Sequence, residues 1–237
     1  DRVDRRRGAI FSSNYEYPGR YTRWDTAIVD PPLGIEANGR HVRILAYNDR
    51  GLVLLDAIDD HLAGHEHVES RHRKGNELTL QVSEAGEVLV EEERSRVPTV
   101  FSVVRAIVDL FFSEADPNIG LYGAFGYDLA FQFDRIDRRL LRPADQRDLV
   151  LYLPDEILVV DHHNAIAWHD RYEYTTHRGT TAGLARGTPE QPFVATDRVP
   201  PRGDHEPGEY SRIVERAKEK FKKGDLLIKE GETPKAF

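Results

Sequence analysis

The polar and aromatic segment from residue 12 to residue 24 holds the side chains best suited to bind a small molecule. Ser12 and Ser13 supply hydroxyl groups, and Arg23 supplies a fixed positive charge. Flat apolar surfaces come from four rings, Tyr15, Tyr17, Tyr21 and Trp24. A small zwitterion with an aromatic side chain suits this lining, because polar groups hold its charged ends while rings cover its body. Loop aromatics also serve as structural plugs, and the residues alone favour that plainer interpretation.

Ten histidines raise a metal site as an alternative chemistry. A metal ion needs ligands that converge on one point, supported by carboxylates behind them. His162 and His163 are adjacent, and adjacent residues on a strand point to opposite faces, so these two do not readily share one ion. The other histidines that lie close in sequence are His169 and, earlier in the chain, His61, His65, His67 and His72. We interpret them as parts of surface turns and predict no metal ligand.

Glycines at 120, 123 and 126 give the chain a superficial likeness to a phosphate-binding loop. The segment lacks the lysine of a P-loop and the GxGxxG order, and we expect no helix N-terminus after it to hold phosphate. It is better explained as a packed strand bent by its glycines. The patterns of a GxSxG nucleophile, an HExxH site and an EF-hand loop do not occur. The chain also has no cysteine, which excludes thiolate catalysis, disulfides and cysteine-ligated metals.

The charge balance of the chain disfavours nucleic acid as a partner. The net charge is −8 and the pI is near 5.7, whereas proteins that bind the phosphate backbone present a clustered basic face. The short basic runs at 5–7 and 218–223 are interpreted as solvated surface. No apolar run approaches the roughly 18 residues of a membrane span, and the charged first residues show no signal peptide. We therefore expect a cytoplasmic protein that has no membrane partner.

Hydrophobic periodicity predicts the elements that must position the segment 12–24. Strands are expected at 8–11, 25–29, 40–48, 77–82, 87–92, 149–153 and 156–161, with a hairpin partner over 165–174. One helical pattern ends at Gly64, a second begins at Pro98 and a third at Pro207. Residues 65–76 are polar and predict an exposed loop. Together these patterns indicate an α+β fold with a largely antiparallel sheet and a few packed helices.

The composition also predicts a division of the chain into three parts. Glycine, proline and threonine accumulate over 178–206 with little periodicity, which is typical of a linker or a surface crossing. The main region, 1–177, precedes it and contains the candidate site. Residues 207–237 follow as a separate region that begins with an amphipathic helix.

Five segments resemble, in order, the anthranilate synthase component I family, specifically the fused form that also carries a glutamine amidotransferase. The most specific segment is FSSNYEYPGRYTRWDTAIVDPPLGI at 11–35. It is followed by PTVFSVVRAIVDLF at 98–111, LYGAFGYDLAFQF at 121–133, DLVLYLPDEILVVDH at 148–162 and GDHEPGEYSRIVERAKEKFKKGDL at 203–226. Because they extend over nearly the whole chain, the resemblance implies that the fold is part of the two-layer fold of this family.

The resemblance implies an enzyme of tryptophan biosynthesis that is inhibited by its end product. A magnesium-dependent half of such an enzyme converts chorismate and ammonia, the latter from glutamine, into anthranilate and pyruvate. Tryptophan binds in the N-terminal region at a strand-and-loop motif that ends in serine, which matches 10–13 here and makes Ser13 the matching serine. Arg23 matches a basic residue ten positions later, and Ser12 stands where many relatives have glutamate. The implied effector contacts are Ser12, Ser13 and Arg23, with the segment 120–127 as core sheet beneath them.

The last residues depart from the family's pattern. After Gly224-Asp225-Leu226 the family continues with an aromatic, acidic and valine-rich strand, whereas this chain continues differently to Phe237. The family's chorismate-binding and magnesium-binding motifs lie beyond this point. The resemblance therefore implies that 207–237 is the truncated start of the chorismate-binding region. It implies no catalytic residue and no cofactor in this chain, and no anthranilate synthesis by the chain alone.

Partners and alternatives follow from the same resemblance. Tryptophan is the expected effector, chorismate and glutamine are expected to act through the missing parts, and the resemblance leaves a homodimer open. A fragment of an aminodeoxychorismate or aminodeoxyisochorismate synthase is one alternative, since those enzymes share the fold. The other is a non-enzymatic regulatory domain that binds an amino acid. Analysis of the reaction product of the full-length protein distinguishes an anthranilate synthase from the first alternative. A compact fold of this chain alone favours the second.

Overall fold

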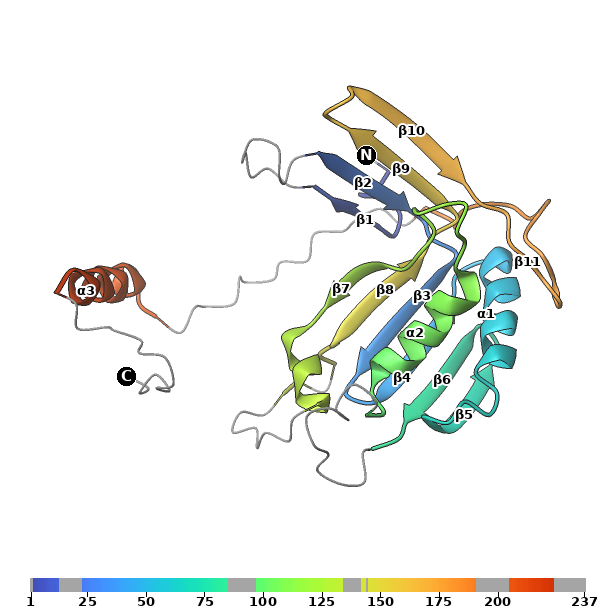
Figure 1. Ribbon diagram of the computed structural model, residues 1–237, viewed down its shortest axis with the longest axis horizontal. Coiled ribbons are helices and arrows are strands. Elements are labelled where there is room, and N and C mark those ends of the chain that lie inside the picture. The colour runs from blue at the N-terminus through green and yellow to red at the C-terminus, as the bar shows by residue number, and fades with distance from the viewer. Residues whose placement is uncertain are drawn as a thin grey trace. The chain divides into compact units, whose positions relative to one another are not determined.

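The computed structural model describes residues 2–12, 23–84, 97–133, 142–143, 145–190 and 205–223 (Figure 1). The chain forms two units, residues 1–193 and residues 194–237. The described part of the first unit contains two antiparallel sheets, a short hairpin and two α-helices. The described part of the second unit contains one helix. Within the described ranges, no helix has the length and apolar character needed to cross a membrane.

The larger sheet has six strands in the order β5-β6-β4-β3-β8-β7, and every neighbouring pair is antiparallel. Its strands are β3 (Leu33–Asn38), β4 (His41–Ala46), β5 (Val68–Lys74), β6 (Glu77–Val82), β7 (Tyr122–Phe125) and β8 (Leu149–Leu153). The helices α1 (Asp49–His61) and α2 (Val100–Phe111) cover one face of this sheet (Figure 1). A short 3-10 helix, η2 (Tyr127–Gln132), follows β7.

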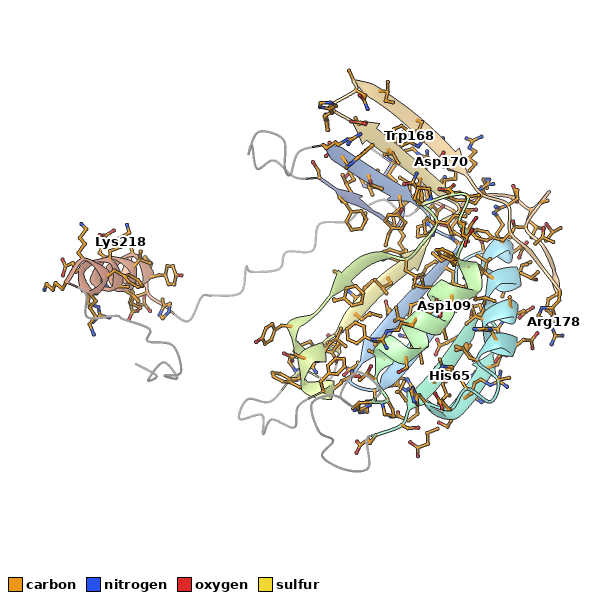
Figure 2. All side chains as sticks on the ribbon, viewed as in Figure 1. His65, Asp109, Trp168, Asp170, Arg178 and Lys218 are labelled. Atoms are coloured by element: carbon orange, nitrogen blue, oxygen red, sulfur yellow. The ribbon has the colours of Figure 1, made fainter. Side chains whose placement is uncertain are left out.

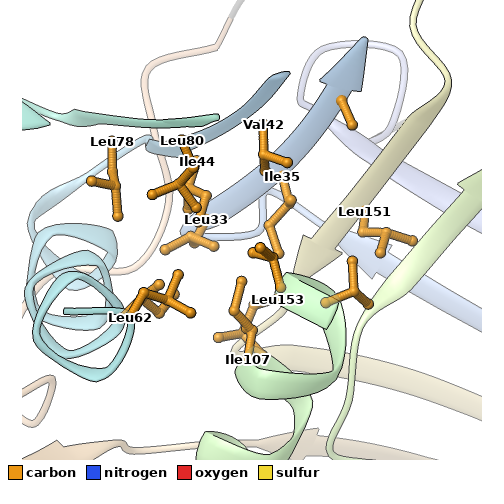
Figure 3. Packing of buried hydrophobic residues seen from close by; sticks show 14 of the residues in the cluster. Leu33, Ile35, Val42, Ile44, Leu62, Leu78, Leu80, Ile107, Leu151 and Leu153 are labelled. Carbon is orange, nitrogen blue, oxygen red and sulfur yellow. The ribbon is translucent and has the colours of Figure 1, made fainter. Parts of the chain in front are cut away.

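The main core lies between this sheet and its two helices. Along β4 and β6 every second residue is buried, because side chains on a strand alternate between its faces. The buried side chains of the strands meet Leu54, Leu55 and Ile58 of α1 and Val103 and Ile107 of α2. Figure 3 shows the leucine and isoleucine side chains of this cluster packed between strands and helices. Burial of this apolar surface is the main force that holds the large sheet to its helices.

The smaller sheet has four antiparallel strands in the order β1-β2-β9-β10. They are β1 (Gly8–Phe11), β2 (Trp24–Val29), β9 (Glu156–Asp161) and β10 (Ile166–Arg171). Its buried apolar cluster consists of Ile28, Ile157 and Val159, packed against rings from both sheets. The opposite face is partly open, since Ile10 and Leu158 are 61% and 44% exposed.

The junction between α1 and the two sheets is held by a buried arginine. Arg50 is fully buried near the start of α1, and its Nε donates to Asp155 in the turn between β8 and β9. Its Nη atoms donate to the Glu173 carboxylate and to the carbonyl oxygens of Thr181 and Tyr172, at 2.7–2.9 Å. These bonds tie the segment after β10, with its hairpin β11 (Thr175–Thr176) and β12 (Gly179–Thr180), to the body of the first unit.

The second unit contains α3 (Glu209–Lys223), an amphipathic helix without a buried residue. Glu209 lies in its first turn and Lys220, Lys222 and Lys223 in its last, which places each charge at the favourable end of the helix dipole. Its large apolar residues Tyr210 and Phe221 are each 65% exposed.

The α+β fold with mainly antiparallel sheets is confirmed, but some elements differ from those expected. Residues 65–76 are not an exposed loop, because they contain the edge strand β5. The central strand β3 was not predicted. The glycine-rich segment is not core sheet, because β7 is an edge strand, Phe125 is 54% exposed and η2 follows it. The strand expected at 87–92 lies outside the described residues. The division at 177 and 206 stays a prediction.

Candidate functional site

Strands β1 and β2 hold the two ends of the segment that the sequence singles out. They pair antiparallel with Phe11 opposite Thr26, which brings Ser12 and Arg23 to the same end of the small sheet. Both residues are exposed. Residues 13–22, which include Ser13, Tyr15, Tyr17 and Tyr21, lie outside the described residues. The structure therefore presents Ser12, Arg23 and Trp24 of the predicted site.

Arg23 is the predicted site residue with the best-defined surroundings. Its Nη2 donates to the Oδ2 atom of Asp161 at 3.2 Å, while about half of its side chain stays exposed (52%). Its guanidinium carbon also lies 4.4 Å from the ring centroid of Trp24, in cation–π range. The Arg23 carbonyl accepts the backbone N–H of His162 at 2.9 Å. The guanidinium is thus held at one edge by a carboxylate and on one face by an indole.

Asp161 is the last residue of β9 and is almost fully buried, at 1% exposure. Its Oδ1 accepts the backbone N–H groups of His163 and Asn164 at 2.9 and 3.2 Å, and its Oδ2 accepts the Asn164 side-chain amide at 2.8 Å. Burial alone raises the pKa of Asp161, but hydrogen bonds from Arg23, Asn164 and His163 outweigh burial and hold this pKa at about 2. The carboxylate is therefore ionised at neutral pH and fixed by the turn that follows it.

An aromatic wall lies on the same face of the small sheet. The rings of Trp24 and Trp168 meet edge to face, with centroids 5.9 Å apart. Trp168 and Asp170 lie on β10 (Figure 2), and the indole N–H of Trp168 donates to Asp170 at 2.9 Å. Trp24 remains 44% exposed, so the wall has a free surface.

The wall continues to the large sheet through Tyr122 of β7. The rings of Tyr122 and Phe11 are 6.0 Å apart, and the Tyr122 hydroxyl donates to the Asn118 carbonyl at 2.6 Å. The Asn118 amide donates in turn to Asp170 at 3.3 Å. Burial, together with the nearby charges of Asp116 and Asp170, raises the pKa of Tyr122, so its hydroxyl stays a neutral donor. Residues from both sheets thus support the rings beside Arg23.

Ser12 takes part in a separate polar group. Hydrogen bonds from His162 and Ser12 to Asp25 lower the pKa of that carboxyl group, and the His162 Nε2 atom lies 2.8 Å from Asp25 Oδ2. Because Trp24 and Asp25 are adjacent on β2, their side chains point to opposite faces. The structure therefore brings Arg23 together with Trp24, whereas Ser12 bonds to Asp25.

Three of the histidines each lie beside an acidic side chain. His162 lies beside Asp25, His177 beside Asp60 at 2.8 Å and His169 beside Glu156 at 3.7 Å. Among the residues that the structure describes, no group of three or more His, Cys, Asp or Glu side chains is placed to hold a metal ion.

A cavity of about 470 Å³ lies elsewhere, between the C-terminal ends of α1 and α2 and residues 173–177. Its two carboxylates are already paired. Asp60 is bonded by Arg178 and His177, and Glu173 by Arg50 and Arg186. We place the candidate site at Arg23, because a guanidinium that is half exposed and oriented leaves donors for a ligand.

Sequence reasoning missed Asp161, Trp168 and Asp170. The order Asp161-His162-His163-Asn164 is typical of a turn in which an aspartate caps the following N–H groups, and this signal predicts a fixed carboxylate. The proximity of Asp161 to Arg23 depends on the pairing of β2 with β9, and the two residues are 138 positions apart in the sequence. No local pattern contains that information.

Two known proteins are similar in sequence to this chain, one of them over nearly its whole length. The chain is similar to an anthranilate synthase of Azospirillum brasilense, with 46% identity over 227 residues, which are 96% of this chain and 31% of that protein. It is also similar to anthranilate synthase component 1 of Buchnera aphidicola subsp. Tetraneura caerulescens, with 25% identity over 57% of this chain and 26% of that protein. No protein-family model matches the chain. The resemblance to anthranilate synthases is confirmed, while the fused form with a glutamine amidotransferase stays a prediction. The chain spans about a third or less of these relatives.

Proposed function

We propose that this chain, which is similar over nearly its whole length to about a third of an anthranilate synthase, is the N-terminal, tryptophan-sensing part of such an enzyme. The observation that carries the proposal is the placement of Arg23. Its guanidinium is fixed by Asp161 and Trp24, yet about half of the side chain is exposed beside an aromatic wall. A carboxylate and an aromatic ring are the two features of tryptophan that such a surface recognises.

The carboxylate of the effector is assigned to Arg23. A guanidinium has five N–H donors, and the ion pair with Asp161 uses one of its nitrogens. Among the described residues, Asp161 is the acidic partner of Arg23 and accepts from Nη2 alone, so the other N–H groups of the guanidinium remain for a ligand. Two parallel N–H···O bonds to a carboxylate are the strongest arrangement that arginine offers.

The indole of the effector is assigned to the wall of Trp24 and Trp168. An edge-to-face pair with an exposed surface accepts a third ring in the same type of packing. We propose Ser12 and Ser13 as further polar contacts. The support for both is the resemblance of 10–13 to the family's motif, and Ser12 also lies at the same end of the small sheet as Arg23.

The activity of the whole enzyme is proposed from its relatives. Both of the relatives described above carry the name anthranilate synthase, which supports synthesis of anthranilate from chorismate and glutamine, with magnesium, in the full protein. We assign that chemistry to the part of the enzyme that this chain does not span, since the Azospirillum protein is about three times as long as the matched segment. The shared name does not favour an aminodeoxychorismate or aminodeoxyisochorismate synthase.

Isothermal titration of tryptophan into the 237-residue chain tests the sensing role. We expect saturable binding that is about 10-fold to 100-fold weaker in Arg23→Ala, because a hydrogen-bonded charge pair contributes about 1.5–3 kcal/mol. Ser13→Ala is expected to weaken binding as well, and phenylalanine to bind less tightly than tryptophan. Arg178→Ala is the matched control, because Arg178 is an exposed, aspartate-paired arginine on a different hairpin. Absence of binding by the folded chain, or equal binding by Arg23→Ala, contradicts the proposal.

A further inference from the structure

The ion pair between Arg23 and Asp161 combines an exposed partner with a buried one. The Arg23 side chain is 52% exposed and that of Asp161 is 1% exposed. An exposed arginine ordinarily samples many rotamers, and ordering it costs free energy each time a ligand binds. Here the free end of the side chain is anchored to a carboxylate that cannot itself move far.

Asp161 is fixed by its own turn. Three donors from His163 and Asn164 converge on its two oxygens, at 2.8–3.2 Å. These bonds orient the carboxylate independently of Arg23, and they leave Oδ2 in place to accept Nη2 of Arg23. The ring of Trp24, 4.4 Å from the guanidinium carbon, limits the remaining rotation of the guanidinium plane.

We infer that Asp161 is a positioning residue of the effector site, which holds the Arg23 guanidinium with its remaining N–H donors available to the carboxylate of the ligand. This inference rests on the proposed sensing role of Arg23. Asp161 acts through Arg23 and does not contact the ligand. The alternative is a purely structural role, in which the ion pair ties the end of β9 to the start of β2.

Spectroscopy of the ligand-free chain tests the positioning directly. Trp24 and Trp168 are the two tryptophans of the sequence and lie 5.9 Å apart, so near-ultraviolet circular dichroism and indole emission report on this wall. We expect Asp161→Asn to shift both signals in the same direction as Arg23→Ala, and the double variant to match Arg23→Ala. A spectrum of Asp161→Asn that equals the wild-type spectrum overturns the inference, whether or not tryptophan binds.

Tryptophan titrations then complete a double-mutant cycle. In the Arg23 background, Asp161→Asn is expected to weaken binding about threefold to tenfold, which corresponds to the ordering of one long side chain. In the Arg23→Ala background, the same substitution is expected to change affinity less than twofold. Equal losses in both backgrounds, or no loss in either, mean that Asp161 does not act through Arg23.

Two controls separate positioning from folding. Asn164→Ala removes one bond to Asp161 but leaves the contact with Arg23, so a structural role predicts that Asn164→Ala and Asp161→Asn weaken binding alike. A positioning role predicts that the loss of affinity in Asp161→Asn depends on the presence of Arg23, whereas any loss in Asn164→Ala does not. Asp60→Asn is the matched remote variant, because Asp60 also pairs with an exposed arginine and has a pKa of about 2. A wild-type chain that does not bind tryptophan refutes the sensing role, whereas a binding chain that Asp161→Asn does not affect refutes only the positioning.

Discussion

The two sheets of the first unit differ in what fills the space beside them. The six-stranded sheet packs leucine, isoleucine and valine against two helices, and its core is continuous from β6 to β8. The four-stranded sheet has three buried apolar residues, Ile28, Ile157 and Val159, surrounded by rings. The same face also holds Trp24, Trp168, Asp161 and Asp170, which contact one another or nearby loops.

This difference indicates that one sheet mainly stabilises the fold and that the other is suited to bind a ligand. A dry aliphatic core binds nothing, because every surface is already covered by another side chain. A small core bordered by aromatic and charged groups leaves a surface with oriented donors, which is what a ligand requires. The large sheet therefore supports the fold, while the small sheet carries the candidate effector site. The following predictions test that division.

The largest expected effect lies at the junction of the two sheets. Arg50→Ala is expected to lower the free energy of unfolding by about 3–4 kcal/mol, because it leaves the buried Asp155 carboxylate without its closest partner. Arg186 keeps a contact with Asp155 at 3.0 Å, which limits the loss. Urea titration measures the change. Arg178→Ala, at an exposed pair, is expected to cost less than about 1 kcal/mol. Similar losses for both variants contradict a structural role for the buried network.

Truncating one isoleucine in each cluster compares how much the two cores contribute to stability. Ile44 of β4 and Ile157 of β9 are both 0% exposed, the first in the large cluster and the second in the small one. Truncation to alanine is expected to cost about 4 kcal/mol at Ile44 and about 2 kcal/mol at Ile157, since the small cluster can collapse around the cavity more easily. Chemical denaturation of both variants measures the difference. A greater loss at Ile157 contradicts the comparison.

A smaller effect follows from the charge of Asp161. Its pKa is about 2 in the folded chain and lies below its ordinary value of 3.8, so ionised Asp161 favours the folded state. This contribution is fully present above about pH 4 and is lost as the pH falls through about 2. The stability difference between wild type and Asp161→Asn is therefore expected to be constant above pH 4 and to shrink below it. Urea titrations between pH 7 and pH 2 measure it. A difference that stays constant down to pH 2 contradicts the assigned ion pair.

The helices and strands that could be predicted from the sequence are those with one buried face and one exposed face. Strands β4 and β6 and helices α1 and α2 alternate polar and apolar residues at the period of their structure, and all four were predicted. Strand β5 reads VESRHRK and has no apolar face, because it is an exposed edge strand held by its pairing with β6. Strand β3 follows two prolines and contains Gly34, and such residues favour turns when read alone.

The candidate site was predictable where it depends on local sequence. Ser12 and Arg23 were identified through the family's motif, and Trp24 through its polar and aromatic surroundings. Asp161 and Trp168 reach Arg23 and Trp24 through the order β2-β9-β10, which is a property of the folded sheet. Loop closure over so long a separation is decided by the whole core, so residue patterns near either partner do not predict the contact.

Hydrogen–deuterium exchange of the chain with and without saturating tryptophan tests most directly the division between a supporting sheet and a sensing sheet. Added protection is predicted in β1, β2, β9 and β10, which surround Arg23, with none in β3, β4, β6 and β8. Arg23→Ala is predicted to lose the added protection while keeping the exchange pattern of the free chain. Protection centred on the cavity between α1 and α2, or no protection anywhere in a folded chain, contradicts the assignment of tryptophan sensing to the small sheet.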